Sequence, residues 1–550
     1  MDFSLLADPS LVFISFIAGV VALATSLNIA ARPAAVKTSK VMLAFTMANF
    51  FFMLTRFANL FYAPLMAKFV DTAANSGSTG ILAGQLRWVI LGSALGGLAS
   101  WILLSTFVEI YRRGIQCLDY RQSLARALMR LARPQAWKVI LGAIRRPSNL
   151  GVKLFHLDGI PAGFLLANVF ATAVWTVGVM AALLVSAELP GMEQTAVLLS
   201  GLVNAFAAIA FSVWVDPKAA VITDQAIKGE RPEKHVDITA VHLAMGNFLG
   251  GVLGLVMLNP AAALIRVAAK ALGEQGEAMN NHLWVIVLFN LSFAFLASTT
   301  YTSRISAVRT SRAATAVAVY NFFFLIARLG QQVFAPMIGA ISDHVVSNPL
   351  LGLPDLAHSL RWVLMGSSLG AFLSWLCMPT LVEVYDKAIQ KTDKMGSIHA
   401  VLVALLNPSN WGAVVRCLRR PSMFGLTVSD FQRIPKTFIL ANVFVIGIHT
   451  VGVVASVYAG AAVPDLERTA SLLSSVVNGF ATIALGLIVD PTAAVITQET
   501  LDEKRPAKDV YAMGILLIIS MLIGTILSQV LLEPARWVIE TGAHILAQIL

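Results

Sequence analysis

Charged residues and cysteines are scarce in this chain. Asp, Glu, Lys and Arg make up 13% of its 550 residues, whereas 57% are hydrophobic. The three cysteines, Cys117, Cys377 and Cys417, show neither a metal-ligand spacing nor a disulfide pattern. This composition excludes a string of soluble domains and a small disulfide-bonded scaffold, and it is typical of a membrane protein.

Motifs of known catalytic centres are also missing. The chain has no HExxH sequence, no Walker A sequence and no carboxylate pair at a recognisable spacing. The segment GSSLG at 366–370 matches the G-x-S-x-G elbow of hydrolases, but it lies in an apolar run and its counterpart at 92–96 has Ala94 in place of Ser368. The glycines instead fit close helix packing. We therefore predict no enzyme activity, no cofactor and no metal.

Long hydrophobic runs dominate the chain instead. At least a dozen stretches approach the roughly 20 residues that cross a bilayer as a helix. The first, near 11–31, is followed by no convincing cleavage site, so we expect an uncleaved span. The net charge of +10 comes from Lys and Arg gathered in short loops between the runs. Membrane topology explains such loops, and nucleic acid is not an expected partner.

The chain consists of two tandem copies of one sequence. NFFFMLTRFANLFYAPLMAKFVD (49–71) aligns with NFFFLIARLGQQVFAPMIGAISD (321–343) at an offset of 272, and from residue 87 onward the offset is 274. The tetrapeptide RRPS also occurs once in each copy. We predict one repeat over 1–275 and a second over 276–550.

Each copy is predicted to contain six membrane-spanning helices. Because six is even, both copies enter the membrane from the same side and form a parallel repeat. The predicted fold is an all-α polytopic membrane protein with about 12 transmembrane helices in two parallel six-helix repeats. The predicted spans lie near 11–31, 41–65, 87–110, 161–186, 194–215 and 236–258, and near 283–303, 313–337, 361–384, 435–460, 468–489 and 510–532.

Loop charges predict the orientation. The loop that holds Arg32 and Lys37 has no acid, and neither does the equivalent loop with Arg304 and Arg309, whereas 186–194 has two acids and no base. Basic loops stay in the cytoplasm, so both termini are expected on the extracytoplasmic side. In the long basic segment LARALMRLARP the leucines share one face. This pattern predicts a cytoplasmic amphipathic helix in the headgroup plane, with a solvated helix packed on the bundle as the alternative.

Two arginines lie deep within predicted spans. Arg56 and Arg328 are each about 16 residues into the second span of their copy, ~22 Å from its cytoplasmic end at ~1.5 Å per residue. A charge at that depth is costly unless it is paired or hydrated. One interpretation is a substrate site in which the guanidinium fork binds phosphate oxygens. The alternatives are an outward-reaching side chain or an internal ion pair.

Several asparagines also lie within predicted spans. Such amides bind sugar hydroxyls in some sites, but hydrogen bonds between neighbouring helices are their commoner use. The substrate-binding candidates among them are Asn49, Asn321, Asn204 and Asn478, and Asn168 and Asn442 lie in the fourth spans.

Glu109 and Glu383 end the third spans. They are candidates for salt bridges with Arg32 and Arg304 at the cytoplasmic mouth, or for binding a coupling proton. His449 stands where the first copy has Trp175. It is a candidate proton sensor, and the alternative is a hydrogen-bonded core histidine.

An Asp-Pro pair closes each fifth span, in VDPKAAVIT (215–223) and VDPTAAVIT (489–497). Because proline disfavours the α conformation of the preceding residue, we predict that the span ends at this point. Asp216 and Asp490 would act as N-caps, and Pro217 and Pro491 would begin new helices. The predicted role is a structural hinge, with substrate gating as the alternative.

These segments together resemble a known family. The stretch AVKTSK…NFFFMLTR, the block from HTVGVVASVYAG to VDPTAAVIT and its counterpart in the first copy are similar to the Amj (alternate to MurJ) family of lipid II flippases. The resemblance implies movement of the undecaprenyl-pyrophosphate-linked peptidoglycan precursor outward across the bacterial plasma membrane. Family members have one six-helix unit, so this chain would be a covalent pseudo-dimer.

The functional hypothesis is a lipid II flippase, with lipid II and membrane lipids as partners. A polar cavity between the two halves would shelter the headgroup while the tail stays in lipid. Basic groups at the entrance would attract the diphosphate, and Arg56 and Arg328 would receive it deeper in. A transporter of another anionic lipid or solute, or a non-transporting membrane scaffold, remains an alternative. The entrance residues are Arg32, Lys37, Arg304 and Arg309.

Overall fold

The part of the chain that the computed structural model describes is mostly helical. Of the described residues 86% are helical, and none lies in a strand. The side chains of some helical residues, among them Pro217, Asn321 and Arg328, are not described. The described residues are 2–38, 44, 55, 62–117, 141–153, 157, 159–227, 229–299, 301–395, 412 and 415–549.

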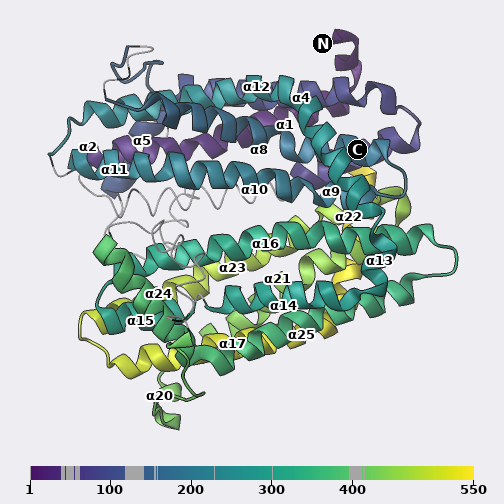
Figure 1. Ribbon diagram of the computed structural model, residues 1–550. Coiled ribbons are helices and arrows are strands. Elements are labelled where there is room, and N and C mark those ends of the chain that lie inside the picture. The colour runs from purple at the N-terminus through teal and green to yellow at the C-terminus, as the bar shows by residue number, and fades with distance from the viewer. Residues whose placement is uncertain are drawn as a thin grey trace. The chain divides into compact units, whose positions relative to one another are not determined.

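The chain divides into two units. Unit 1 comprises Met1–Lys270 and His544–Leu550. In unit 1, α1 packs along α4 and α8 along α10, and α2, α5 and α11 lie together at one end (Figure 1). Its helices are α1 (Pro9–Ser26), α2 (Ala31–Thr38), α4 (Thr79–Ile102), α5 (Leu104–Cys117), α8 (Ala162–Glu188), α9 (Glu193–Leu198), α10 (Ser200–Ala210), α11 (Asp216–Ile227) and α12 (Lys234–Gly273).

Unit 2 comprises Ala271–Ala543 and repeats these pairings. Here α14 packs along α17 and α21 along α23, while α15 and α24 lie together at one end (Figure 1). Its helices are α13 (Gly276–Asn281), α14 (Leu283–Thr299), α15 (Thr302–Thr310), α16 (Ala313–Ser347), α17 (Leu353–Met395), α20 (Val428–Gln432), α21 (Lys436–Ala462), α22 (Glu467–Leu472), α23 (Ser474–Ala484), α24 (Asp490–Leu501) and α25 (Ala507–Ile549).

Nine helical segments of the described chain are long and apolar enough to cross a membrane. The prediction of an all-α, multi-pass membrane protein is therefore confirmed. Some helices exceed their predicted spans: α12, α17 and α25 contain 40, 43 and 43 residues. At ~1.5 Å per residue they are roughly 60 Å long, about twice the hydrocarbon thickness. Most of the span predicted at 41–65 and the segment LARALMRLARP lie outside the described residues, and the orientation of the termini stays a prediction.

Glycines allow the closest helix contacts. A Cβ added to Gly366 would lie 2.5 Å from the backbone oxygen of Val287. Added to Gly92 or Gly96, a Cβ would overlap the backbone of α1. The interpretation of these glycines as helix-packing residues is confirmed. GSSLG lies within the continuous helix α17, so it is not a hydrolase elbow.

The Asp-Pro pairs do not end the fifth spans, contrary to the prediction. A π-turn, η3 (Phe211–Val215), leads directly into α11, and Asp216 has helical φ and ψ of −63° and −43°. In unit 2, η6 (Leu485–Val489) leads into α24 in the same way, with Asp490 at −63° and −44°. The wider turn shifts the hydrogen-bond register just before the proline, so the helical backbone continues although proline has no N–H. Asp216 and Asp490 are therefore not N-caps.

Candidate functional site

The deepest predicted site residues are described only in part. Asn49 and Arg56 lie outside the described residues. Asn321 and Arg328 lie in α16, where the structure describes their backbone alone. The anion site assigned to these arginines therefore stays a prediction.

Each unit contains an ion pair between α2 or its counterpart α15 and the residue that follows the π-turn. Arg32 Nη2 lies 2.6 Å from Asp216 Oδ1, and Arg304 Nη2 lies 3.3 Å from Asp490 Oδ1. The Arg32 side chain is 14% exposed and that of Asp216 is 58% exposed. A 3₁₀ turn, η2 (Leu27–Ala30), directly precedes α2. In unit 1 the ion pair therefore connects a helix that follows a 3₁₀ turn with a residue that follows a π-turn.

The Arg32 guanidinium retains hydrogen-bonding capacity. Its Nη1 is buried and has no hydrogen-bond partner among the described residues. A buried N–H group without a partner is costly, so an incoming acceptor at this position would be stabilised. Arginine and an oxyanion such as phosphate make strong, charge-assisted hydrogen bonds.

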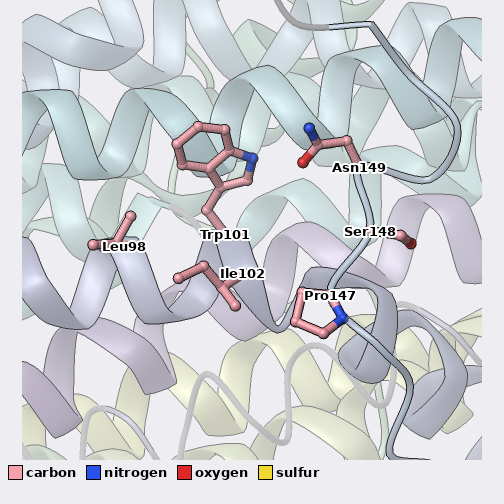
Figure 2. Close-up of a pocket in the computed structure, with 6 residues that line it drawn as sticks. All are labelled: Leu98, Trp101, Ile102, Pro147, Ser148 and Asn149. Carbon is pink, nitrogen blue, oxygen red and sulfur yellow. The ribbon is translucent and has the colours of Figure 1, made fainter.

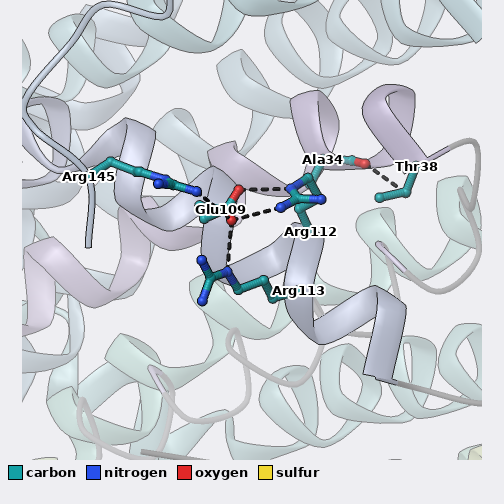
Figure 3. A network of polar contacts seen from close by, with 6 residues as sticks. All are labelled: Ala34, Thr38, Glu109, Arg112, Arg113 and Arg145. Atoms are coloured by element: carbon teal, nitrogen blue, oxygen red, sulfur yellow. Dashed lines mark hydrogen bonds and ion pairs between the residues drawn. The ribbon is translucent and has the colours of Figure 1, made fainter. Parts of the chain in front are cut away.

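Glu109 pairs with three other arginines and not with Arg32, so the predicted salt bridge at the mouth is wrong. Arg112, Arg113 and Arg145 donate to its carboxylate over 2.8, 2.8 and 3.0 Å and surround it from different sides (Figure 3). Because Arg112 comes from the same helix turn and Arg145 from a distant loop, only the fold brings all three together.

Glu109 is held in its ionised form. The hydrogen bonds from Arg112, followed by those from Arg113 and Arg145, lower its pKa to about 2, although burial acts in the opposite direction. A carboxyl group with so low a pKa binds no proton near neutral pH. The geometry therefore does not support the alternative of a coupling proton on Glu109.

The repeated RRPS tetrapeptide is anchored in the same way in both units. The backbone N–H of Arg145 donates to Thr106 Oγ1 over 3.0 Å, and that of Arg419 donates to Thr380 Oγ1 over 2.9 Å. Arg145 and Arg419 also reach Glu109 and Glu383. Sequence reasoning missed these two arginines as site residues. The signal was present, because RRPS recurs in both copies at equivalent positions.

Unit 2 has a different charge balance around the equivalent glutamate. Glu383 lies 3.4 Å from Arg419 and 3.9 Å from Arg309, not next to Arg304 as predicted. Arg309 is closer to Asp386, at 3.0 Å, and Asp386 is the counterpart of Arg112. In the ion pairs of the described residues, two acids therefore face two arginines in unit 2, whereas one acid faces three arginines in unit 1, and Lys387 stands at the position of Arg113.

The predicted asparagines of the fifth spans pack against glycines. Asn204 lies against Gly178 and Asn478 against Gly452, with no room for a Cβ on either glycine. Each Oδ1 is buried without a hydrogen-bond partner among the described residues. These contacts place both asparagines between two helices of their own unit, which fits a packing role. A role in binding sugar stays a prediction.

Other intramembrane polar groups also contact neighbouring helices. Asn168 donates to the Leu243 oxygen over 3.2 Å, and Asn442 donates to Ser520 Oγ over 2.7 Å. His449 Nε2 lies 3.4 Å from Thr482 Oγ1. The hydrogen bonds of Asn168 and Asn442 are those of helix-packing residues.

A shallow cavity, open on one side, lies beside the RRPS segment of unit 1, and all of its lining residues are partly or fully exposed. Its volume is about 380 Å³, within the range of small-molecule sites. Figure 2 shows the indole nitrogen of Trp101 on the side of the ring that faces the Asn149 side chain. The lining residues are Leu98, Trp101, Ile102, Pro147, Ser148 and Asn149.

Both halves of the chain are similar to one family. The family model described as "Amj: Alternate to MurJ" matches residues 17–269 and again residues 289–543. The protein "Lipid II flippase Amj" of Bacillus subtilis (strain 168) is 30% identical over 241 residues, which are 44% of this chain and 89% of that protein. No solved structure matches. The relative thus corresponds to about one unit, and the tandem duplication is confirmed.

Proposed function

The chain belongs to the Amj family, and from this we propose that it is a lipid II flippase. It would move the undecaprenyl-pyrophosphate-linked precursor of peptidoglycan between the leaflets of the bacterial plasma membrane. The observation that carries the proposal is that both halves match a family that includes a lipid II flippase. We propose transport, not catalysis.

The charges of unit 1 suit the headgroup of this substrate. A diphosphate is costly to move through hydrocarbon unless protein groups replace its hydration. Arginines in excess of carboxylates attract it and offer planar donors to its oxygens. Arg112 and Arg145 share one glutamate, and each guanidinium has more N–H groups than this carboxylate accepts from, so both can also donate to a second anion.

The Arg–Asp pairs offer a means of coupling binding to movement. A diphosphate that binds Arg32 competes with Asp216 for the same guanidinium. Release of Asp216 would remove the ion pair between α2 and the end of the π-turn, so that only their apolar contacts would hold the two together. Arg304 and Asp490 provide the same latch in unit 2. The hinge role predicted for Asp216, Pro217, Asp490 and Pro491 is kept in this proposal.

The direct test is translocation of fluorescent lipid II in vesicles that contain the purified chain, followed with a membrane-impermeant quencher. The wild type is expected to expose lipid II on both faces but to leave a labelled phosphatidylglycerol on its original face. Equal movement of both lipids would indicate a less selective transporter, and movement of neither would indicate a scaffold.

The intramembrane site has its own test in the same assay. We expect Arg56→Ala/Arg328→Ala to lose lipid II movement, because the two guanidinium groups predicted to bind the diphosphate within the membrane would be missing. Arg87→Ala and Arg361→Ala, at the start of the third spans, are controls expected to keep it. Full activity of the Arg56/Arg328 double variant would remove these two residues from the site and leave the flippase function intact.

A further inference from the structure

We propose that unit 1 alone holds a sugar-binding subsite, formed by the cavity of Trp101, Ser148 and Asn149, next to an arginine site for the attached phosphate. The proposal rests on the proposed function, and it names where the headgroup binds. Its expected ligand is the phosphate-linked sugar of a polyprenyl lipid.

The cavity combines an apolar wall with three polar side chains, one of which has a buried N–H without a partner among the described residues. Leu98, Ile102 and Pro147 supply the wall. The indole N–H of Trp101 is buried and has no hydrogen-bond partner among the described residues. Ser148 and Asn149 line the same space. A sugar matches this set, because its C–H face can lie on an aromatic ring while its hydroxyl and acetamido groups take the hydrogen bonds.

A phosphate attached to that sugar would lie close to two arginines. Arg145 and Arg146 directly precede Pro147 in the chain, and Arg146 is exposed and forms no ion pair with any described residue. Arg145 is already fixed on Glu109 with Arg112. The sugar pocket and the anion site are therefore consecutive along one short segment.

The segment has a fixed backbone. Thr106 Oγ1 accepts from the Arg145 N–H, and Ser105 donates to the Arg146 oxygen over 3.2 Å. After the pocket residues, Leu150 and Gly151 turn the chain with φ of 51° and 75°. A leucine in this left-handed region costs about 1 kcal/mol or more, so surrounding contacts must hold the turn. A fixed loop loses little entropy when a ligand binds.

Unit 2 has lost part of the chemistry of this subsite but keeps its framework. RRPS is present, its anchor to Thr380 is present, and Phe424 adopts the same left-handed φ, at 52°. However, Met423 replaces Asn149, so the carboxamide is gone. Phe372 replaces Leu98, and its ring lies 5.9 Å from that of Trp375, the counterpart of Trp101.

The arginine site next to this subsite has also lost a group that would bind phosphate. Asp386 replaces Arg112 and takes Arg309 as its partner. Unit 2 thus lacks one polar group and one arginine of the unit 1 site, although it keeps the counterparts of Trp101, Ser148 and Arg146 and has Lys387 at the position of Arg113. We therefore expect the two halves to bind the headgroup unequally.

The test compares two ligands with the full-length chain in nanodiscs. Lipid II carries the sugars, whereas undecaprenyl pyrophosphate has the diphosphate and tail without them. We expect Trp101→Phe and Asn149→Met each to weaken lipid II binding about tenfold, on the order of one hydrogen bond. Neither variant should change the affinity for undecaprenyl pyrophosphate. Arg112→Asp, by contrast, should weaken the binding of both ligands.

The matched controls are Trp375→Phe and Met423→Ala in unit 2, which should leave both affinities unchanged. Asn149 lies in a loop, so Asn149→Met tests the pocket even if Trp101→Phe reduces the melting temperature. Unchanged lipid II binding by Asn149→Met and Trp101→Phe, or an equal loss in Trp375→Phe, would overturn the proposal. If the wild type neither binds nor moves lipid II, the flippase function itself fails, which is a distinct result.

Discussion

At the scale of single residues, Glu109 determines how three arginines can share one small volume. Its carboxylate accepts from Arg112, Arg113 and Arg145, which come from two separate parts of the chain. Without an anion the three guanidinium groups would repel one another. Glu109 therefore both orients the arginines and leaves them with a net positive charge.

Glu109→Gln is expected to lower the free energy of unfolding by about 1–3 kcal/mol at neutral pH. This figure allows for solvent screening of the ion pairs, because the arginines are partly exposed. The pKa of Glu109 is lowered from 4.5 to about 2, so its stabilising effect is present above 4.5 and is lost as the pH falls towards 2. Thermal unfolding of both proteins at pH 7 and about pH 3 checks this. The difference in stability should shrink at the lower pH, and a constant difference would contradict the assigned pKa.

The sequence predicted which residues carry charge near the cytoplasmic mouth but not their partners. Arg32 was expected beside Glu109 and instead contacts Asp216, 184 residues away. Loop-charge reasoning places residues at a face of the membrane, and says nothing of which helices are neighbours there. Arg145 was overlooked for a related reason: its contact with Glu109 depends on a loop docking through Thr106.

At the scale of helices, the π-turns are the main departure from expectation. Local rules correctly placed an irregularity at each Asp-Pro pair, but they predicted a helix end. The backbone instead widens by one turn and continues as α11 and α24. Conformational propensity describes a residue in isolation. In the folded protein, packing against neighbouring helices keeps the fifth span helical through the Asp-Pro pair.

Asp216→Asn tests whether the Arg32 pair acts as a latch. The carboxylate is more than half exposed, so the loss of stability should be below about 1 kcal/mol. Lipid II movement should nevertheless fall several-fold, because the ion pair between α2 and the end of the π-turn would be lost and only apolar contacts would remain. Arg32→Asp/Asp216→Arg should restore part of the wild-type rate. A translocation rate unchanged in Asp216→Asn and in Asp490→Asn would argue against a latch.

Gly96→Ala tests the contact between α1 and α4. Its Cβ would overlap the backbone oxygen of Gly19, which cannot move without moving α1. We expect a loss of stability of about 2 kcal/mol or more, as in other overpacked sites. Gly80→Ala in the same helix meets nothing within 4 Å and serves as the control. It should be neutral or slightly stabilising, because alanine favours helix more than glycine does. Equal melting temperatures for both variants would contradict the close contact.

At the scale of the whole molecule, the duplication was predictable because it is written directly in the sequence. Hydropathy also predicted the class of fold, since every backbone group in a bilayer core must be bonded within its own helix. The difference between the halves was harder to predict. Arg112 and Asp386 look like one surface substitution in an alignment of the two copies. Only the cluster around Glu109 and Glu383 shows its effect on local charge.

The final prediction follows from the lengths of the two units and of their relative. Because 89% of the Bacillus subtilis relative aligns with 241 residues of this chain, that protein is about as long as one unit. We expect residues 1–275, produced as a separate chain, to move lipid II in vesicles. Residues 276–550 alone should not, since Met423 and Asp386 replace the groups that bind the headgroup in unit 1. If these two differences cause the loss, Met423→Asn/Asp386→Arg should restore lipid II movement to isolated 276–550. Full activity of unmodified 276–550 would instead mean that the two units are interchangeable.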